Sequence, residues 1–104
     1  MGEKALLFAV IVRIPPSGVG AFQEYETCVL SLLAEHGGVL QRRVRTEDGT
    51  MEIHLVAFPS QAVFEAYRSD PRRAAYAPLL AASGAISELS KVDDVDLPAL
   101  DERT

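Results

Sequence analysis

Apolar and polar residues alternate on both sides of Asp48-Gly49, over residues 39–46 and 50–58. Such alternation is typical of half-buried strands, and Asp-Gly favours the positive φ angles of a two-residue type I′ turn. The pattern therefore predicts a β-hairpin whose register is fixed by its turn.

The two faces of this hairpin are expected to differ in chemistry. The register places Arg45 opposite Glu52 and Arg43 opposite His54, so one face carries a polar cluster. The other predicted pairs are Gln41–Val56 on the polar face, and Val44–Ile53 and Leu40–Ala57 on an aliphatic face.

The rest of the chain divides into one helix, a second helical region and two further strands. Residues 5–14 are nearly all apolar, as expected of a central strand covered on both sides. Apolar residues recur at helical spacing over 19–36, and again from residue 60 to about 82 with a break at Ser69-Asp70-Pro71. Residues 86–92 form the last predicted strand.

The element order β-α-β-β-α-β predicts a ferredoxin-like α+β fold. Right-handed crossovers place the first and third strands in the centre of a four-stranded antiparallel sheet, with both helices on one face. We expect residues 1–92 to form this single domain and residues 93–104 to form an acidic C-terminal tail.

The helices of such a fold leave the other face of the sheet uncovered. On the first strand that face carries Leu7, Ala9 and Ile11. An exposed apolar face is unusual for a monomer, so a homodimer formed through this face is expected.

Composition argues against some classes of binding partner and indicates the cellular compartment. The net charge of −5 argues against nucleic acid and anionic membranes, which require a cationic surface. Cys28 is the only cysteine, so no intrachain disulfide can form, and the apolar run at 5–12 is too short to span a bilayer. The two histidines lack the spacing of metal ligands, so we expect no metal site. We also expect no cofactor and a cytoplasmic location.

A polar cluster on the non-helical face of the sheet is the candidate site. Antiparallel pairing of the first and third strands is expected to bring Arg13 beside Glu52 and His54, next to Arg43 and Arg45. The surplus of guanidinium groups suits a small carboxylate or enolate, with His54 as general acid or base. In the alternative interpretation the same residues form only salt bridges at the dimer interface or sheet edge.

Other polar residues are assigned structural roles. Arg68, Arg72 and Arg73 are expected on a solvated helical surface, and Tyr25 and Tyr67 in core stripes with hydroxyls near the pocket rim.

The chain resembles the dimeric α/β-barrel group, and within it small uncharacterised and NIPSNAP-like families. The resemblance rests on Ala34-x-His36-Gly37-Gly38, Phe58-Pro59-Ser60, and Ser69-Asp70-Pro71 followed by Tyr76 and an apolar run to Leu80, and it covers residues 5–92. It implies two sheets packed face to face, with a pocket in each protomer between sheet and helices or within the barrel. The group contains cofactor-independent monooxygenases, lactone isomerases, haem-degrading enzymes and proteins of no assigned role.

Two functions remain open at this stage. One is a cofactor-free oxygenase or isomerase acting on a small organic anion, in which His54 moves a proton and the arginines stabilise an enolate. The other is a non-catalytic small-molecule binder or dimeric scaffold. The fold alone does not decide between them.

Overall fold

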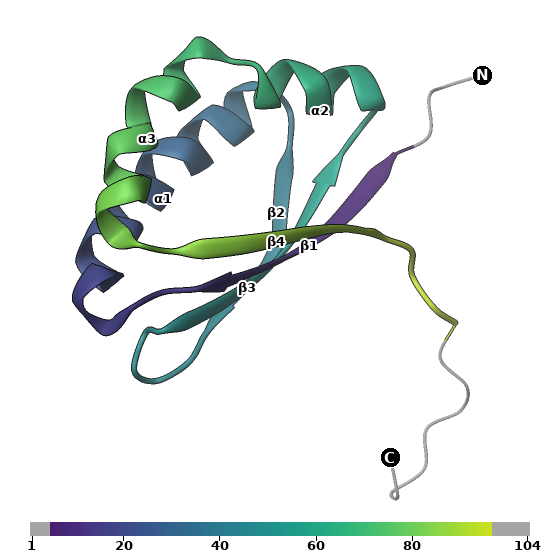
Figure 1. Ribbon diagram of the computed structural model, residues 1–104. Coiled ribbons are helices and arrows are strands. Elements are labelled where there is room, and N and C mark those ends of the chain that lie inside the picture. Colours follow the sequence, from purple (N-terminus) through teal and green to yellow (C-terminus); the bar gives the residue numbers. More distant parts are fainter. Residues whose placement is uncertain (1–4, 97–104) are drawn as a thin grey trace, which may run out of the picture.

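Four strands and the helices on one side of them make up the part of the chain that the structure describes, residues 5–96 (Figure 1). In this computed structural model the strands are β1 (Leu6–Arg13), β2 (Val39–Arg45), β3 (Met51–Phe58) and β4 (Ile86–Val92). The helices are the 3₁₀ turn η1 (Pro16–Gly18), α1 (Val19–Glu35), α2 (Gln61–Arg68) and α3 (Pro71–Ser83). Of the predicted tail, residues 97–104 lie outside the described part.

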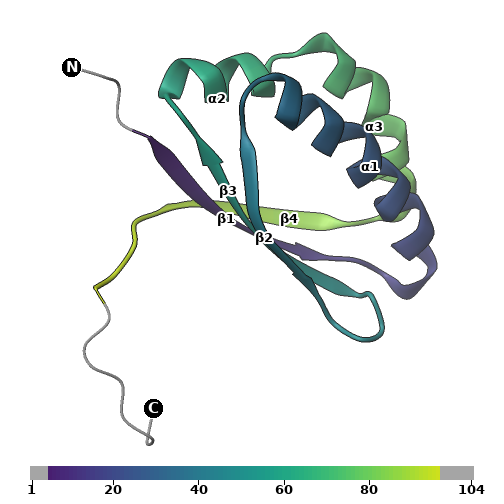
Figure 2. The same cartoon turned by 180° about the vertical axis from the view of Figure 1, so that it is seen from behind.

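The strands form one antiparallel sheet in the order β2-β3-β1-β4. The central strands are β1 and β3, and the three α-helices lie on a single face of the sheet, as the views from both sides show (Figures 1 and 2). The predicted ferredoxin-like α+β fold is therefore confirmed. No helix within residues 5–96 has the length and apolar character needed to cross a membrane.

Local sequence signals set the helix boundaries. The Ser60 hydroxyl accepts a hydrogen bond from the Val63 amide at 3.2 Å and caps α2, while the Asp70 carboxylate accepts one from the Arg72 amide at 2.9 Å and caps α3. Pro71 occupies the first turn of α3, where its missing N–H costs no hydrogen bond. The predicted break between two helical segments is thus confirmed.

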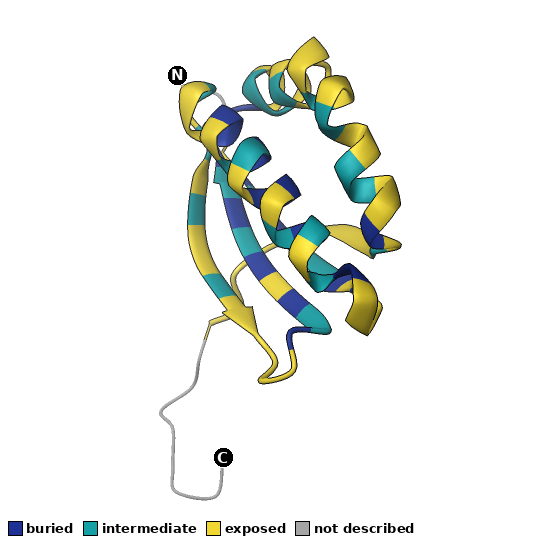
Figure 3. Cartoon of the chain, turned by 90° about the vertical axis from the view of Figure 1, so that its left-hand side faces the viewer, coloured by how far each residue is buried: buried dark blue, intermediate teal, exposed yellow. Residues whose placement is uncertain are grey.

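The hydrophobic core lies between the sheet and the helices. On β1, the buried side chains alternate with half-buried ones, and Phe8 stacks on Phe64 of α2 with ring centroids 4.4 Å apart. Phe58 of β3 meets the same Phe64 ring edge-on at 5.1 Å. The same alternation of buried and more exposed positions is visible along β3 (Figure 3).

The hairpin register agrees with the prediction near the turn and departs from it farther away. Arg45 pairs with Glu52 and Arg43 with His54, but the register shifts between Leu40 and Arg42. The predicted pairs Gln41–Val56 and Leu40–Ala57 are therefore wrong, because Leu40 pairs with Val56 and Val39 with Ala57. The extra residue, Gln41, forms a bulge that turns Leu40 toward the core.

The predicted type I′ turn is also wrong. Among residues 5–96, positive φ angles occur only at glycines, and Gly49 has a φ of 78° whereas Asp48 does not adopt one. Strand pairing ends before the turn, and the Asp48 carboxylate accepts hydrogen bonds from Thr50 and Thr46. A longer loop stabilised by this side chain replaces the two-residue turn.

The sheet face that points away from the helices is mostly aliphatic. Several large apolar residues on it are exposed: Val39 by 55%, Val44 by 41%, Ile53 by 39% and Ile86 by 74%. The chain therefore has an apolar surface where its helices do not reach.

Candidate functional site

Glu52 and His54 point toward the helices, which corrects the predicted position of the cluster. On β3 they alternate with exposed Ile53 and are 1% and 4% exposed. Arg13 pairs with Met51, one position out of phase, so its side chain lies on the other face. The prediction of one cluster on the non-helical face was wrong because neighbouring residues of a strand point to opposite faces.

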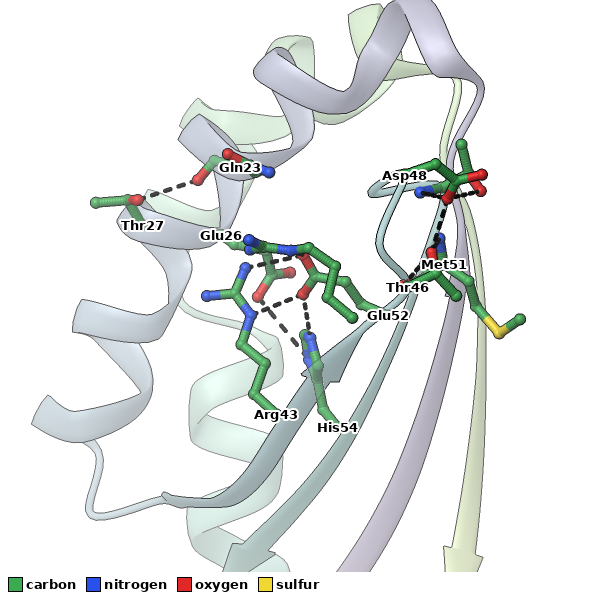
Figure 4. A network of polar contacts seen from close by, with 11 residues as sticks. Gln23, Glu26, Thr27, Arg43, Thr46, Asp48, Met51, Glu52 and His54 are labelled. Atoms are coloured by element: carbon green, nitrogen blue, oxygen red, sulfur yellow. Dashed lines mark hydrogen bonds and ion pairs between the residues drawn. The ribbon is translucent and has the colours of Figure 1, made fainter.

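Glu52 joins the side chains of the cluster (Figure 4). Its Oε1 accepts hydrogen bonds from Arg43 Nε at 2.7 Å and from His54 Nε2 at 2.8 Å. Its Oε2 accepts hydrogen bonds from Arg43 Nη2 at 3.1 Å and Arg45 Nε at 2.9 Å. The structure thus brings together four of the five predicted site residues, and both arginines are occupied by a carboxylate of the protein itself.

These contacts keep Glu52 ionised. Burial alone disfavours its charge, but the hydrogen bonds from Arg43, His54 and Arg45 outweigh burial and lower the pKa of Glu52 to about 2. The side chains of Arg43 and Arg45 are 27% and 41% exposed, so they connect the buried carboxylate to solvent.

The ionised state of Glu52 determines the tautomer of His54. An ionised carboxylate only accepts hydrogen bonds, so His54 Nε2 carries the hydrogen in the 2.8 Å contact. In the neutral ring Nδ1 then holds the lone pair. A ring nitrogen oriented in this way by a carboxylate can act as a general base.

Glu26 of α1 is the second buried carboxylate of the site, and the sequence analysis gave it no role. It is 7% exposed, and its Oε2 lies 4.0 Å from His54 Nδ1 (Figure 4). Burial raises the pKa of Glu26, and the nearby positive charge of His54 and Arg43 offsets only part of that rise. The sequence did contain a signal for Glu26. This carboxylate follows Phe22 by four residues and precedes Val29 by three, so it lies within the apolar stripe of the helix.

A cavity of about 210 Å³ opens beside His54, between the helices and the sheet. Its polar lining includes Glu26 and His54, while aromatic rings such as Phe8, Phe64 and Tyr67 form much of the rest. The volume is below the roughly 300–1,000 Å³ of pockets for drug-sized ligands, so the cavity suits a molecule of one or two rings.

Two arginines of this cavity were expected on a solvated surface. Arg68 at the end of α2 is exposed as expected, whereas Arg73 at the start of α3 is half-buried, and both line the cavity. Tyr25 and Tyr67 line it as well, in agreement with their expected place near a pocket. The hydroxyl of Tyr67 donates a hydrogen bond to the Val29 carbonyl at 3.5 Å.

The acidic and imidazole groups of the cluster do not form a metal site. Within residues 5–96, no three His, Cys, Asp or Glu side chains are placed to hold a metal ion together. Glu52 directs its oxygens to arginines and to His54, and Glu26 stands on the other side of the imidazole. The geometry instead suits proton transfer at His54 Nδ1.

Several solved structures share the fold of this chain. SnoaB, a cofactor-independent oxygenase from Streptomyces nogalater, matches with a TM-score of 0.72 and 14% identity, over 94% of this chain and 100% of that chain. A Caulobacter crescentus protein provisionally assigned as an antibiotic biosynthesis monooxygenase matches with a TM-score of 0.70 and 8% identity, over 88% and 92%. A Rhodopseudomonas palustris protein of unknown function matches with a TM-score of 0.73 and 17% identity, over 91% and 85%.

Sequence comparisons add no closer relationship. No protein-family model matches the chain, and no curated protein matches it. At such low identities the structural matches establish the architecture and leave the activity open. The chain therefore has an α+β ferredoxin-like fold that matches the fold of these oxygenase and monooxygenase-like structures.

Proposed function

We propose that the chain is an enzyme that removes a proton from a small organic acid bound in the cavity beside His54. The observation that carries this proposal is the orientation of His54, whose Nε2 is hydrogen-bonded to ionised Glu52 while its Nδ1 lies 4.0 Å from Glu26, and both His54 and Glu26 line the cavity. A fixed acceptor nitrogen in a mostly apolar cavity is suited to deprotonate a phenol, an enol or an activated C–H group.

The buried charges stabilise the protonated base. When His54 takes a proton, the imidazolium lies between the carboxylates of Glu52 and Glu26. Arg43 and Arg45 hold Glu52 in place, so their role is to position the base rather than to bind the ligand as the sequence suggested. These two arginines and Glu52 are positioning residues in this proposal.

Oxygenation is the reaction we favour, with molecular oxygen as the oxidant. The substrate C–H bond breaks and its proton moves to His54, and the electron pair left on carbon forms a bond to one oxygen of O₂. The proton then returns from the imidazolium to the outer oxygen, which yields a hydroperoxide and the free base. The similarity in fold to SnoaB, a cofactor-independent oxygenase, supports this choice.

An isomerase would share the first step. In that case the proton returns to a different carbon and no oxygen is consumed. A non-catalytic binder or scaffold is the alternative, and one observation favours it: Arg43, Arg45 and His54 together satisfy both carboxylate oxygens of Glu52, as in a purely structural ion-pair network.

Activity on weakly acidic ring compounds tests the proposal. Phenols, hydroxyquinones and small aromatic carboxylates are first screened for binding by thermal shift, because a ligand bound to the native state raises the melting temperature. Compounds that bind are then tested for oxygen consumption and for uptake of deuterium from D₂O. His54→Gln is expected to lower turnover by about 10²- to 10⁴-fold, the usual contribution of a general base.

His36→Gln is the matched control for that experiment. His36 is hydrogen-bonded to Asp70 at 2.8 Å and does not line the cavity, so turnover is expected to be unchanged. Equal loss of turnover in both variants, or none in His54→Gln, contradicts the role of His54. Compounds that bind without consuming oxygen or exchanging protons would instead support the non-catalytic binder.

We also propose that the protein is a homodimer whose subunits meet through the non-helical face of the sheet. Val44, Ile53 and Ile86 form an exposed apolar surface there, and a second copy is the simplest partner for such a face. A cytoplasmic location and a closer relationship to small uncharacterised and NIPSNAP-like families stay predictions from the sequence.

A further inference from the structure

The two cavity arginines, Arg68 and Arg73, lie against aromatic rings of α2. The guanidinium carbon of Arg73 lies 4.7 Å from the centroid of the Tyr67 ring, and that of Arg68 lies 5.5 Å from the Phe64 ring. Both rings also line the cavity. Positive charge and aromatic surface are therefore adjacent in the lining.

Arg73 differs from the paired arginines of the chain in lacking a carboxylate partner. Arg43, Arg45 and Arg72 each form an ion pair with a carboxylate, whereas within residues 5–96 neither Arg68 nor Arg73 does. Glu26 lines the same cavity without forming an ion pair with Arg73.

One hydrogen-bonding group of Arg73 is left without a partner. Its Nε is the only buried side-chain nitrogen or oxygen in the described part of the chain with no hydrogen-bond partner, and its Nη1 donates only a long bond of 3.5 Å to the Arg68 carbonyl. A buried cationic donor without an acceptor is costly, and an anion held by the guanidinium group of Arg73 in the cavity would offset the cost of its unpaired charge.

We propose that Arg73, assisted by Arg68, binds the anionic group of an aromatic substrate in this cavity. The anion is a carboxylate, phenolate or enolate, and its ring lies among Phe8, Phe64 and Tyr67. This inference rests on the proposed function for the location of the substrate, and it assigns the anion to Arg73 instead of to Arg13, Arg43 and Arg45. His54 remains the group that takes the proton.

The test compares two ligands of equal shape that differ in charge. Binding of benzoate and of benzamide to the full chain is measured by calorimetry at neutral pH and low salt. Benzoate is expected to bind about 10- to 100-fold more tightly than benzamide, as one or two charge-assisted hydrogen bonds predict. In Arg73→Met this preference is expected to vanish while the affinity for benzamide stays the same.

Three control variants separate charge, site and catalysis. Arg73→Lys keeps the positive charge and is expected to retain part of the preference, whereas Arg42→Met removes one exposed positive charge outside the cavity and is expected to retain all of it. His54→Gln is expected to keep the preference although it loses turnover. Circular dichroism of each variant establishes that it is folded.

The outcomes distinguish the inference from the proposed function. Equal binding of benzoate and benzamide to the wild-type chain, or a preference that survives Arg73→Met, overturns the role of Arg73 and leaves the cavity as a ligand site. Failure of both compounds to bind the wild-type chain overturns the inference together with the assignment of the cavity. Loss of the preference in Arg42→Met as well as in Arg73→Met also overturns it, because the effect is then one of net charge.

Discussion

Each face of the sheet departs in one respect from what is expected of an isolated domain. At its hairpin end the face under the helices holds Glu52 and His54, and Glu26 of α1 lies near them; the three residues are 1%, 4% and 7% exposed. The outward face holds aliphatic residues, of which Val44 and Ile53 are 41% and 39% exposed. Buried charge and exposed aliphatic surface each cost folding free energy, so each face is expected to serve a function that offsets its cost.

The difference indicates two separate roles for the faces. A buried ion pair is weak support for stability, because desolvation of its charges offsets their attraction, so the inner cluster is better explained by chemistry in the adjoining cavity. The outer face exposes Val39, Val44, Ile53 and Ile86 and is suited to bury apolar area against another subunit. We therefore assign ligand chemistry to the inner face and self-association to the outer face.

Removing the carboxylate of Glu52 is expected to have the largest effect on stability. In Glu52→Ala, His54 and two arginines lose a shared buried partner, and the free energy of unfolding is expected to fall by about 3–5 kcal/mol. Urea denaturation measures the change, with Glu47→Ala as the control because Glu47 is exposed on the same hairpin. A loss below about 1 kcal/mol in Glu52→Ala would show that the inner cluster is not a connected network.

The stabilisation from Glu52 is expected to disappear in acid. Its pKa is about 2 in the folded chain against an ordinary value of 4.5, so the folded state binds fewer protons between these values and loses stability as the pH falls. The contribution is fully present above about pH 5, amounts to about 3 kcal/mol, and is lost as the pH falls toward 2. The difference in unfolding free energy between wild type and Glu52→Gln should therefore shrink over this range, and a constant difference would contradict the lowered pKa.

A charge on the outer face tests the assignment of that face. Ile53→Asp places a carboxylate in the exposed apolar surface, and it is expected to weaken self-association by at least about 30-fold, or about 2 kcal/mol. Sedimentation equilibrium measures the change, and Glu47→Lys serves as a charge control on the exposed loop. A wild-type chain that is monomeric at micromolar concentration would refute the assignment directly.

Neutralising Glu26 is expected to have the smallest effect, and in the opposite direction. Burial raises its pKa, so the ionised form is disfavoured in the folded chain, and stability from this group falls as the pH rises through its unfolded value. Glu26→Gln should therefore raise the unfolding free energy at pH 7, by less than about 1 kcal/mol. Destabilisation by this substitution would contradict the expected penalty of burying ionised Glu26.

The sequence was sufficient for the architecture because local signals agreed with one another. The bounds of β4, the start of β2 and the break at Asp70-Pro71 followed from apolar periodicity and capping residues. The bulge at Gln41 was not predictable, since it depends on the gain from turning Leu40 into the core. A tertiary contact decided that position against the local pattern.

The sequence predicted which residues of the candidate site lie next to one another, but not the face of the sheet on which they lie. The hairpin register brought Arg43, Glu52 and His54 together correctly, but which face the helices cover could not be read from the alternation of the hairpin alone. Placing the polar side of the hairpin on the non-helical face was the error, because Glu52 and His54 face the helices. Glu26 and Arg73 come from helices that reach the cavity only after packing, so no local pattern linked them to His54.

The tautomer of His54 tests the central claim most directly, because the proposed chemistry requires a lone pair on Nδ1. Nitrogen-15 spectra of the imidazole rings distinguish the two neutral tautomers, and His36→Gln assigns the remaining signal to His54. We predict that Nε2 carries the hydrogen and that Nδ1 is unprotonated, in keeping with the 2.8 Å contact to Glu52. A hydrogen on Nδ1 would contradict the account, since the lone pair that the proposed proton transfer requires would then be missing from that nitrogen.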